Sequence, residues 1–397
     1  MEFRTVKIGD ICEVVTDYVA NGSFKSLSEN VKYYDKGYAR VIRLVDYNNK
    51  FEKKDSIWVS KDAYEFLKKS KLEGGEIVIT NVGANLGTVF IAPQLDYPQT
   101  LGPNSIIIKT KENDKYIYYL LLSRYGQNKI KEIVSGSAMP KFNKTDFKNI
   151  IIQLPSIENQ KKVVKMLSAL DKKIELNNKI NDNLLEIINT LYKNEFIDVK
   201  EYKRAEEIAD ITIGKTPPRG NKECFSTKNE DVKWASIADL GKCGTYILDT
   251  REKLTKEAVD NYNVKVIPKN TIILSFKLTI GRIAITSQEM ATNEAIAHFN
   301  LEDKDMLYYL YSYLKNFDYE KLGSTSSIAT AVNSKIIKAM PIVIPDKETL
   351  ENYNEKVSSM FEKIRENEFE NKKLEQLRDT LLPELMNGEI DLDNIKI

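Results

Sequence analysis

The sequence predicts an α+β fold in which two similar globular units alternate with two long helices. Two observations predict this fold. The chain resembles itself when it is shifted by 190 residues, and two stretches carry apolar residues at the spacing of a helix that packs along one side. With 397 residues, 42% of them hydrophobic, the chain is long enough to bury a separate core in each unit.

The internal repeat extends through strand-like segments, turns and helices. "EIVITNVGANLGTVFI" (76–91) resembles "TIILSFKLTIGRIAI" (271–285), and "GSAMPKFN" (136–143) resembles "GSTSSIATAVN" (323–333), with loops of different length. "YYLLL" (118–122) matches "YYLYS" (308–312). Short runs rich in Val, Ile, Thr and Tyr, separated by turns, favour mixed units. We therefore predict α/β units at residues 1–155 and 197–345.

Each unit is followed by a predicted long helix, over 156–196 and 346–390, and residues 391–397 form a C-terminal tail. The helices begin just after Pro155 and Pro345, and Gly388 marks the end of the second. Their apolar stripes coincide at the same offset, from Leu167 over Val357 to Ile187 over Leu377 and Leu191 over Leu381. One helix cannot bury such a stripe alone. We expect an antiparallel coiled coil with a local twofold axis, because the intervening unit must return the chain.

Asparagines interrupt both stripes at matching positions, Asn177 and Asn181 in the first helix and Asn367 and Asn371 in the second. A buried polar layer lowers stability but fixes the register, since a slip leaves amides unpaired. We expect the two pairs to meet. The alternative is that they lie at the edge of the stripe and are solvated.

Composition and charge exclude several classes of protein. No apolar run approaches the roughly 20 residues of a membrane span, and the N-terminus lacks an apolar signal region, so we expect a cytoplasmic protein. Cys12, Cys224 and Cys243 are too dispersed for a disulfide framework or zinc site, and the single histidine, His298, lies in a strand-like segment that indicates a structural or surface role.

The net charge of +1 hides an asymmetry. Residues 1–155 carry 23 basic and 18 acidic residues, whereas residues 346–397 carry 8 basic and 14 acidic ones. A mildly basic block permits binding to a polyanion without demonstrating it.

The order of unit, helix, unit and helix resembles the specificity subunit of type I restriction-modification systems. The resemblance covers essentially the whole chain. It depends most on "LPSIENQKKVVKMLSALDKKIELNNKINDNLLEIINTLYKNEF" after the first unit and "LEQLRDTLLPELMNGEI" after the second, and more weakly on "ITIGKTPPRG" and "VKWASIADL". Two departures stand out: Leu350 occupies the place of Gln160, and the first unit opens with "TDYVANGSF" instead of a "TPP" segment. The two ends therefore need not contact partner subunits identically.

The resemblance implies that each unit is a target recognition domain that reads one half of a split double-stranded DNA site, and that the coiled coil sets the unread spacer. It also implies a subunit without catalysis of its own. Such a subunit positions two methyltransferase subunits, which methylate adenine N6, and recruits restriction subunits. S-adenosylmethionine, ATP and Mg would be bound by those partners and not by this chain.

Residues that contact DNA are expected in polar turns between strands and just before helices. Arg reads guanine and Asn or Gln reads adenine, while Lys, Ser and Thr suit phosphates. In the first unit the candidates are Arg40, Arg43, Asn81, Asn85, Ser135, Ser137, Lys141, Asn143 and Lys144. In the second they are Lys215, Arg219, Lys222, Ser275, Lys277, Thr279, Arg282, Ser324, Thr325, Ser327, Thr330 and Lys335. The alternative for any one of them is a solvated turn residue.

Two other functions were weighed. An adenine methyltransferase normally has an (Asp/Asn/Ser)-Pro-Pro-aromatic turn, but the only Pro-Pro pair here is "TPPR" (216–219), and no Gly-rich nucleotide loop occurs. A two-headed coiled-coil scaffold that does not bind DNA fits the repeat equally well. The family resemblance favours the DNA-binding alternative.

Overall fold

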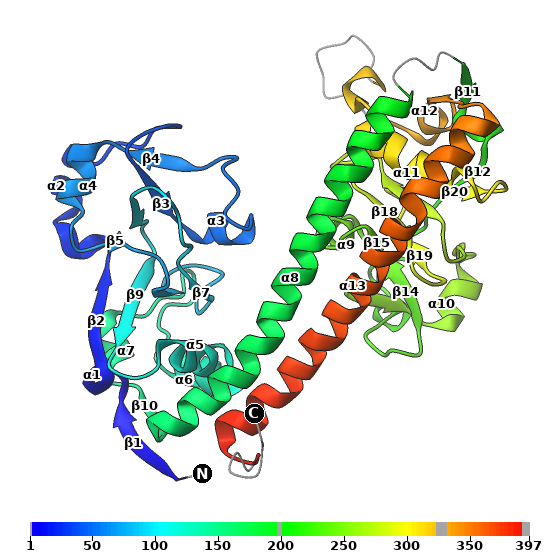
Figure 1. Ribbon diagram of the computed structural model, residues 1–397. Coiled ribbons are helices and arrows are strands. Elements are labelled where there is room, and N and C mark those ends of the chain that lie inside the picture. Colours follow the sequence, from blue (N-terminus) through cyan, green and yellow to red (C-terminus); the bar gives the residue numbers. More distant parts are fainter. Residues whose placement is uncertain (1, 197–200, 323–331, 391–397) are drawn as a thin grey trace. The chain divides into compact units, whose positions relative to one another are not determined.

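The computed structural model of the protein describes residues 2–196, 201–322 and 332–390 (Figure 1). The chain divides into two compact units: unit 1 is Met1–Asp171 with Glu375–Ile397, and unit 2 is Lys172–Leu374. The division passes through both long helices, α8 (Ile157–Phe196) and α13 (Lys347–Asn387). Each unit therefore contains a stretch of both helices.

Unit 1 contains two four-stranded sheets and a two-stranded ribbon. The first sheet is antiparallel, with β2 (Cys12–Asp17), β9 (Ser105–Thr110), β6 (Ile77–Thr80) and β7 (Val89–Ile91) in that order. The second has the order β4 (Ile57–Val59), β3 (Ala39–Ile42), β8 (Gln99–Leu101) and β5 (Lys71–Leu72). Strands β3 and β8 are parallel. The ribbon pairs β1 (Phe3–Lys7) with β10 (Ile151–Pro155).

Strand β6 of the first sheet of unit 1 is buried on both faces. Alternate residues of a strand point to opposite faces. Ile77 and Ile79 accordingly pack with α5 (Asp114–Leu122), whereas Val78, which lies between them, packs with residues of the second sheet. The core on the helical side also takes in Leu167 of α8 and Leu385 of α13. The long helices are thus part of the core of this unit.

Short helices complete unit 1. They are α1 (Ile8–Ile11), η1 (Tyr18–Asn21), α2 (Phe24–Asn30), α3 (Leu44–Asn48), α4 (Lys61–Phe66), α6 (Arg124–Glu132) and α7 (Lys144–Lys148).

Unit 2 repeats this plan. Its first sheet has the order β12 (Ala209–Ile213), β20 (Ile296–Leu301), β17 (Ile272–Ser275), β18 (Ile283–Thr286) and β15 (Tyr246–Ile247). Its second has β13 (Phe225–Ser226), β16 (Glu252–Leu254), β14 (Val232–Ala235) and β19 (Ala291–Thr292), the last two parallel. The ribbon pairs β11 (Tyr202–Arg204) with β21 (Pro341–Val343).

The helices of unit 2 also have counterparts in unit 1. They are η2 (Ala205–Glu207), η3 (Lys222–Cys224), α9 (Ile237–Leu240), α10 (Lys256–Asn261), α11 (Met306–Asn316), η4 (Tyr319–Leu322) and α12 (Ser334–Lys338). The segments "YYLLL" and "YYLYS" lie on α5 and α11, and the two strand–turn–strand segments form β6–β7 and β17–β18. The predicted α+β repeat is confirmed.

The two long helices pack against each other in opposite directions within each unit. In unit 2, Ile188 of α8 shares a core with Val357, Phe361 and Ile364 of α13. In unit 1, the beginning of α8 shares a core with the end of α13. Gly388 has a φ of 74°, the left-handed conformation that often ends a helix, and α13 ends at the residue before it.

The predicted apolar stripe is wrong at one matched pair of positions, whereas its last pair, Leu191 and Leu381, is partly buried against the cores of the two units. Ile187 and Leu377 are 45% and 46% exposed, and Ile188 and Leu382 are buried near those positions instead. An α-helix has 3.6 residues per turn, so a stripe at heptad spacing drifts around the helix unless the helices supercoil. In α8 the buried position lies one residue further along, at Ile188.

His298 lies inside the first sheet of unit 2. Its two ring nitrogens are 2.9 Å and 2.7 Å from the hydroxyls of Thr212 and Thr292, and burial lowers its pKa to about 4. The side chain is therefore neutral and structural, as predicted. Within the described ranges, no helix combines the length and apolar character needed to cross a membrane.

Candidate nucleic-acid interface

In unit 1, two of the predicted loops form one hydrogen-bonded surface. The turn between β6 and β7 meets the loop of residues 134–143 through Gly83 N, which donates to Pro140 O at 2.9 Å, and through Phe142 N, which donates to Asn81 O at 3.1 Å. The Asn81 amide also donates to Phe142 O at 3.2 Å. The fold thus brings together segments that are some 60 residues apart in the chain.

The polar side chains of this surface are available to a ligand in most cases. Asn85, Ser135, Ser137, Lys141 and Asn143 are exposed, and Asn81 is half-buried because its amide binds the neighbouring loop.

The end of this surface is held by α7. Asn143 caps that helix by accepting a hydrogen bond from Asp146 N at 2.8 Å, and Lys144 forms an ion pair with Asp17 at 2.7 Å. The structure therefore gives these two residues local roles, although the Asn143 side chain stays exposed.

Unit 2 builds the same turn with different side chains. In unit 1, Thr88 N donates to Thr80 Oγ1 at 3.0 Å and Gly87 N donates to Thr80 O at 2.8 Å. In unit 2, Arg282 N donates to Ser275 Oγ at 3.1 Å and Gly281 N donates to Ser275 O at 3.0 Å.

The glycines of these turns have φ values of 85° and 89°, which favour residues without a side chain. The outer edge of the turn also matches, because Asn81 N donates to Asn104 O and Phe276 N donates to Ala295 O. A conserved backbone frame therefore presents Asn81 and Asn85 in unit 1 but Lys277 and Thr279 in unit 2.

A second segment lies beside this turn in unit 2. Lys215 N donates to Thr292 O at 2.9 Å, and the Thr216 hydroxyl donates to the exposed carboxylate of Glu294. Nearby Lys277 and Arg219 help to lower the pKa of Glu294, although the hydrogen bond from Thr216 is the larger favourable cause. Lys215 is exposed and the segment contributes positive charge to the surface.

Arg219 is held in a fixed position. Its guanidinium lies 4.4 Å and 4.7 Å from the ring centres of Phe225 and Trp234, and Nη1 contacts both carboxylate oxygens of Glu252 at 2.9 Å. Half of the side chain stays exposed. Lys222 is exposed on η3.

Two candidates of unit 1, Arg40 and Arg43, have structural positions that the sequence did not predict. Arg40 is fully buried, and its guanidinium donates to Phe51 O at 2.8 Å and to Glu52 O at 2.7 Å. Arg43 pairs with Asp46 at 2.9 Å and also donates to the backbone of the same loop. We correct the assignment of Arg40: it braces a loop and is not exposed to DNA.

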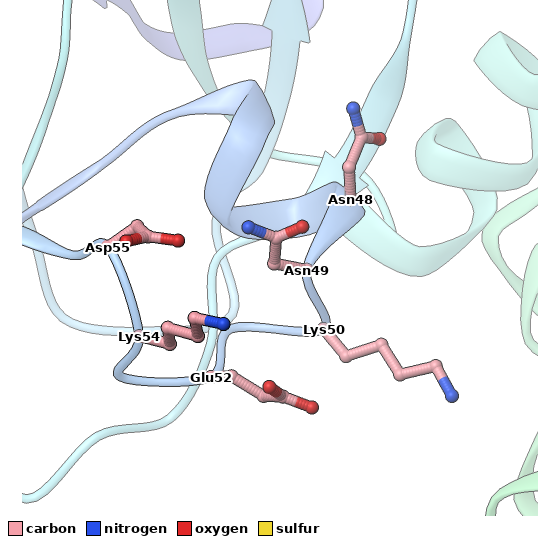
Figure 2. A pocket seen from close by; sticks show the side chains of 6 residues that line it. All are labelled: Asn48, Asn49, Lys50, Glu52, Lys54 and Asp55. Carbon is pink, nitrogen blue, oxygen red and sulfur yellow. The ribbon is translucent and has the colours of Figure 1, made fainter. Parts of the chain in front are cut away.

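The loop braced by Arg40 and Arg43 borders an open surface pocket of about 330 Å³, which is lined by Asn48, Asn49, Lys50, Glu52, Lys54 and Asp55 (Figure 2). Only this one polar segment lines the pocket, and its acidic and basic side chains alternate. It has no convergent set of groups that would define a ligand.

The remaining candidates in unit 2 divide into three cases. Ser275 is completely buried and forms part of the turn frame, so we correct its assignment as a contact residue as well. Arg282 is half-buried and donates to Ile237 O at 2.8 Å. Lys335 is exposed on α12, whereas Ser324, Thr325, Ser327 and Thr330 lie outside the described residues.

The four stripe asparagines meet inside unit 2. Asn177 donates to Asn371 at 2.9 Å, and Asn367 donates to Asn181 at 2.8 Å. Their exposed fractions are between 1% and 8%, so the solvated alternative does not hold. Asn371 in turn donates to Asn178, and Asn177 also donates to Glu370. The register role of this layer stays a prediction.

Sequence reasoning missed several residues that join the helices to the recognition sheets. In unit 2, Glu368 of α13 accepts hydrogen bonds from Thr245 N at 2.7 Å and Tyr246 N at 2.9 Å, and burial raises its pKa to about 7. Lys372 donates to Asp249 at 2.8 Å.

In unit 1, a different set of contacts joins the long helices to the rest of the unit. Asp171 of α8 accepts from Tyr119 at 2.6 Å and pairs with Arg378 at 3.0 Å. Gln160, the residue at which the two helices differ, is buried and donates to Glu112 and to Pro155 O, whereas Leu350 is packed in the apolar core of unit 2. These contacts carried no signal in the sequence, because a single charged residue on a long helix cannot be distinguished in sequence from a charged residue that faces solvent.

The fold and its surface define a class: a protein with two copies of one mixed domain, each of which presents polar loops on a repeated frame and packs on paired helices. The model of the type I restriction modification DNA specificity domain matches residues 1–186 and again 198–379. The chain belongs to this family.

Relatives support the same assignment. The specificity subunit of the type I restriction enzyme HindI from Haemophilus influenzae is 24% identical, with 81% of this chain and 88% of that protein covered. The MjaIX specificity subunit from Methanocaldococcus jannaschii is 27% identical, with 81% and 79% covered. The crystal structure of a type I S subunit from M. genitalium has the same fold, with a TM-score of 0.54, 15% identity, and 97% and 96% covered.

Proposed function

We propose a division of labour within this chain, which is a DNA specificity subunit of the type I restriction-modification class. Unit 1 reads one half of a bipartite duplex site and unit 2 reads the other. The observation that carries this proposal is the repeated turn frame, together with a family match that occurs twice in the chain. Variation of side chains on a constant frame lets two related units read different sequences.

The loops of unit 1 and unit 2 offer different chemistry to the bases. The exposed amide of Asn85 can present a paired donor and acceptor, which complements the acceptor and donor of adenine in the major groove, whereas the Asn81 amide already donates to Phe142 O. Lys277, Thr279 and Lys215 suit guanine or phosphate oxygens. Arg219 is already oriented by Glu252 and by two aromatic rings, so little rotational freedom is lost when it binds.

The long helices supply the spacer in this proposal. Pairing through the asparagine layer fixes how the helices register, and each helix continues into the core of a recognition unit. A helix rises about 1.5 Å per residue, so the length between the units determines the number of unread base pairs.

The chemistry belongs to partner subunits in this proposal. Two methyltransferase subunits would use S-adenosylmethionine to methylate adenine N6 in each half-site, and restriction subunits would join the same complex. ATP and Mg would be bound there as well. Of the two other functions considered, a scaffold without DNA is not supported by the family match, and a methyltransferase would belong to a different family.

Binding and methyl transfer can be separated in one experiment. The chain is purified alone and with its methyltransferase partner, and each sample receives labelled S-adenosylmethionine and duplexes with and without the site. We expect site-specific binding and methylation only with the partner present. Methyl transfer by the chain alone would favour the enzyme alternative. If the complete complex shows no preference for any duplex, the scaffold alternative is favoured.

A further inference from the structure

We propose that Leu278 is an apolar wedge that enters the base stack of the half-site read by unit 2. This inference rests on the proposed function and adds one specificity-determining residue to it. Its basis is the unusual combination of full exposure, a left-handed backbone and a rigid turn at a single apolar residue.

The exposure of Leu278 is extreme. The side chain is 98% exposed, whereas the next most exposed large apolar side chain in the described ranges, Phe24, is at 79%. Isolated apolar residues on a surface are common and need no explanation. This one, however, lies at the tip of the turn that faces the candidate interface, between Lys277 and Thr279.

The backbone of Leu278 is also unusual. Its φ of 62° lies in the left-handed region, which bulky L-residues rarely adopt. Most of the other described non-glycine residues with positive φ are Asn or Asp. Strain of this kind persists where the surroundings impose it, and it is concentrated at functional positions.

Hydrogen bonds around Leu278 hold its backbone in this left-handed conformation. Ser275 Oγ donates to Thr279 O at 2.6 Å, and Thr279 N donates to Lys277 O at 2.7 Å, so the tip is closed on both sides. Arg282 braces the base of the turn through its bond to Ile237 O. The side chain is thus held outward before any ligand arrives, and little ordering remains to be done on binding.

The neighbours of Leu278 fit a DNA backbone on either side of the tip. Lys277 and Thr279 are exposed and suit phosphate oxygens. Proteins insert Leu, Phe, Ile or Met side chains between base steps to unstack and kink a duplex. Enzymes that modify a base must also remove it from the stack, which leaves a gap that an apolar side chain can fill. In the turn of unit 1, Thr80 Oγ1 donates to Asn85 O as Ser275 Oγ donates to Thr279 O in unit 2, so the small residue Ala84 stands at the place of Leu278. We therefore assign the wedge to unit 2.

The experiment uses the complex of the full chain with its methyltransferase subunits and duplexes that carry 2-aminopurine at successive positions of the half-site. The adenine that is methylated is mapped first and left out of the series. We expect the wild-type complex to raise the fluorescence at one base step, because unstacked 2-aminopurine emits more strongly. Leu278→Ala and Leu278→Asn should abolish this rise and weaken binding on the order of tenfold.

The variants are chosen so that folding does not decide the result. Asn tolerates a positive φ and is similar in size to Leu, so Leu278→Asn removes only the apolar character. Leu278→Met should restore the fluorescence. Met139→Ala, which removes another exposed apolar loop residue (64% exposed) in unit 1, should leave the unit 2 step unchanged.

Two outcomes would overturn the wedge. The first is a fluorescence rise that persists in Leu278→Asn. The second is a wild-type complex that unstacks no base step but loses the same affinity when uracil replaces thymine in the half-site. The second result would make Leu278 a reader of the thymine methyl group. Failure of the proposed function is distinct, because the wild-type complex would then discriminate no duplex at all.

Discussion

At the scale of single residues, the asparagine layer of unit 2 joins the two long helices through buried side-chain hydrogen bonds, and its role in fixing their register is a prediction. Asn371 accepts from Asn177 and donates to Asn178, so one amide joins two residues of the opposite helix. Asn367 also pairs with Asn181, but its side-chain oxygen has no partner. Such a layer adds less stability than leucine would, yet it penalises every other register.

Truncation of one member should therefore be costly. We expect Asn371→Ala to lower the free energy of unfolding of unit 2 by about 1–2 kcal/mol, because the buried Asn177 amide loses its hydrogen bond to Asn371 and keeps only the one to Glu370. Thermal unfolding of the purified chain measures the change. Asn183→Ala, at an exposed position of α8, is the control and should change stability by less than about 0.5 kcal/mol. Equal effects of both substitutions would contradict a buried hydrogen-bonded layer.

Glu368 makes unit 2 sensitive to pH. Burial raises its pKa from the ordinary glutamate value of 4.5 to about 7. The folded state therefore binds the proton more tightly than the unfolded state does. The stabilisation is complete below the unfolded-state pKa and is lost as the pH rises to about 7.

We expect the wild type to lose stability relative to Glu368→Gln, which cannot titrate, between about pH 4.5 and 7. The difference should be about 1–3 kcal/mol. Unfolding midpoints of both proteins measured across this range test the sign. A difference that grows in the opposite direction would show that the two hydrogen bonds from Thr245 and Tyr246 outweigh the cost of burial.

At the scale of elements, the proposed recognition surface consists of loops braced by a backbone frame. Phe142 is buried and Asn143 caps α7, so the ends of the loop 135–144 are fixed while its middle is exposed. The side chains at the tip can therefore change without loss of the frame.

An exchange of this loop should change one half of the recognised site only. Residues 135–141 are replaced by an equal number of different polar residues, and Phe142, Asn143 and Lys144 are retained. We expect the methylated sequence to change in one half and to keep the other half and the spacer. The reciprocal exchange of residues 277–279 in unit 2 is the control and should change the opposite half. A change in both halves after either exchange would refute modular reading.

Pairing of the two long helices should not tolerate a deletion that rotates one helix relative to the other. Deletion of four residues from the middle of α8 or α13 removes about 6 Å of helix and rotates one apolar stripe relative to the other by about 40°. The asparagines and their apolar neighbours then lose their partners together. We expect site-specific methylation to be abolished, as measured on a duplex that contains the site. Undiminished recognition at the original spacing would argue against the helices as the spacer.

The elements themselves were largely predictable from the sequence, and the roles of single polar residues were not. Periodic apolar residues, the prolines before each helix and Gly388 after the second act locally, so they marked α8 and α13 well. Arg40 was assigned wrongly because its buried partners come from a loop that only the folded chain places around it. Glu368 and Asp171 escaped notice for the same reason, since a helix surface in sequence does not show what packs on it.

At the scale of the whole molecule, the defining feature is that one globular unit occurs twice in the chain. Under the proposed function, two units with one frame and different loops read a site with two different halves, and the paired helices set the gap between those halves. The net charge of +1 is small for a protein that binds DNA alone. Much of the nonspecific, salt-dependent affinity should therefore come from partner subunits.

Genome-wide mapping of N6-methyladenine in cells with and without the gene tests this account most directly. We expect one split motif to lose its methylation when the gene is removed, with modified adenines in both halves and a spacer of constant length between them. Restoration of the gene should restore the motif. A single uninterrupted motif, a spacer of variable length, or identical maps in both strains would contradict the proposal that two units read DNA at a set separation.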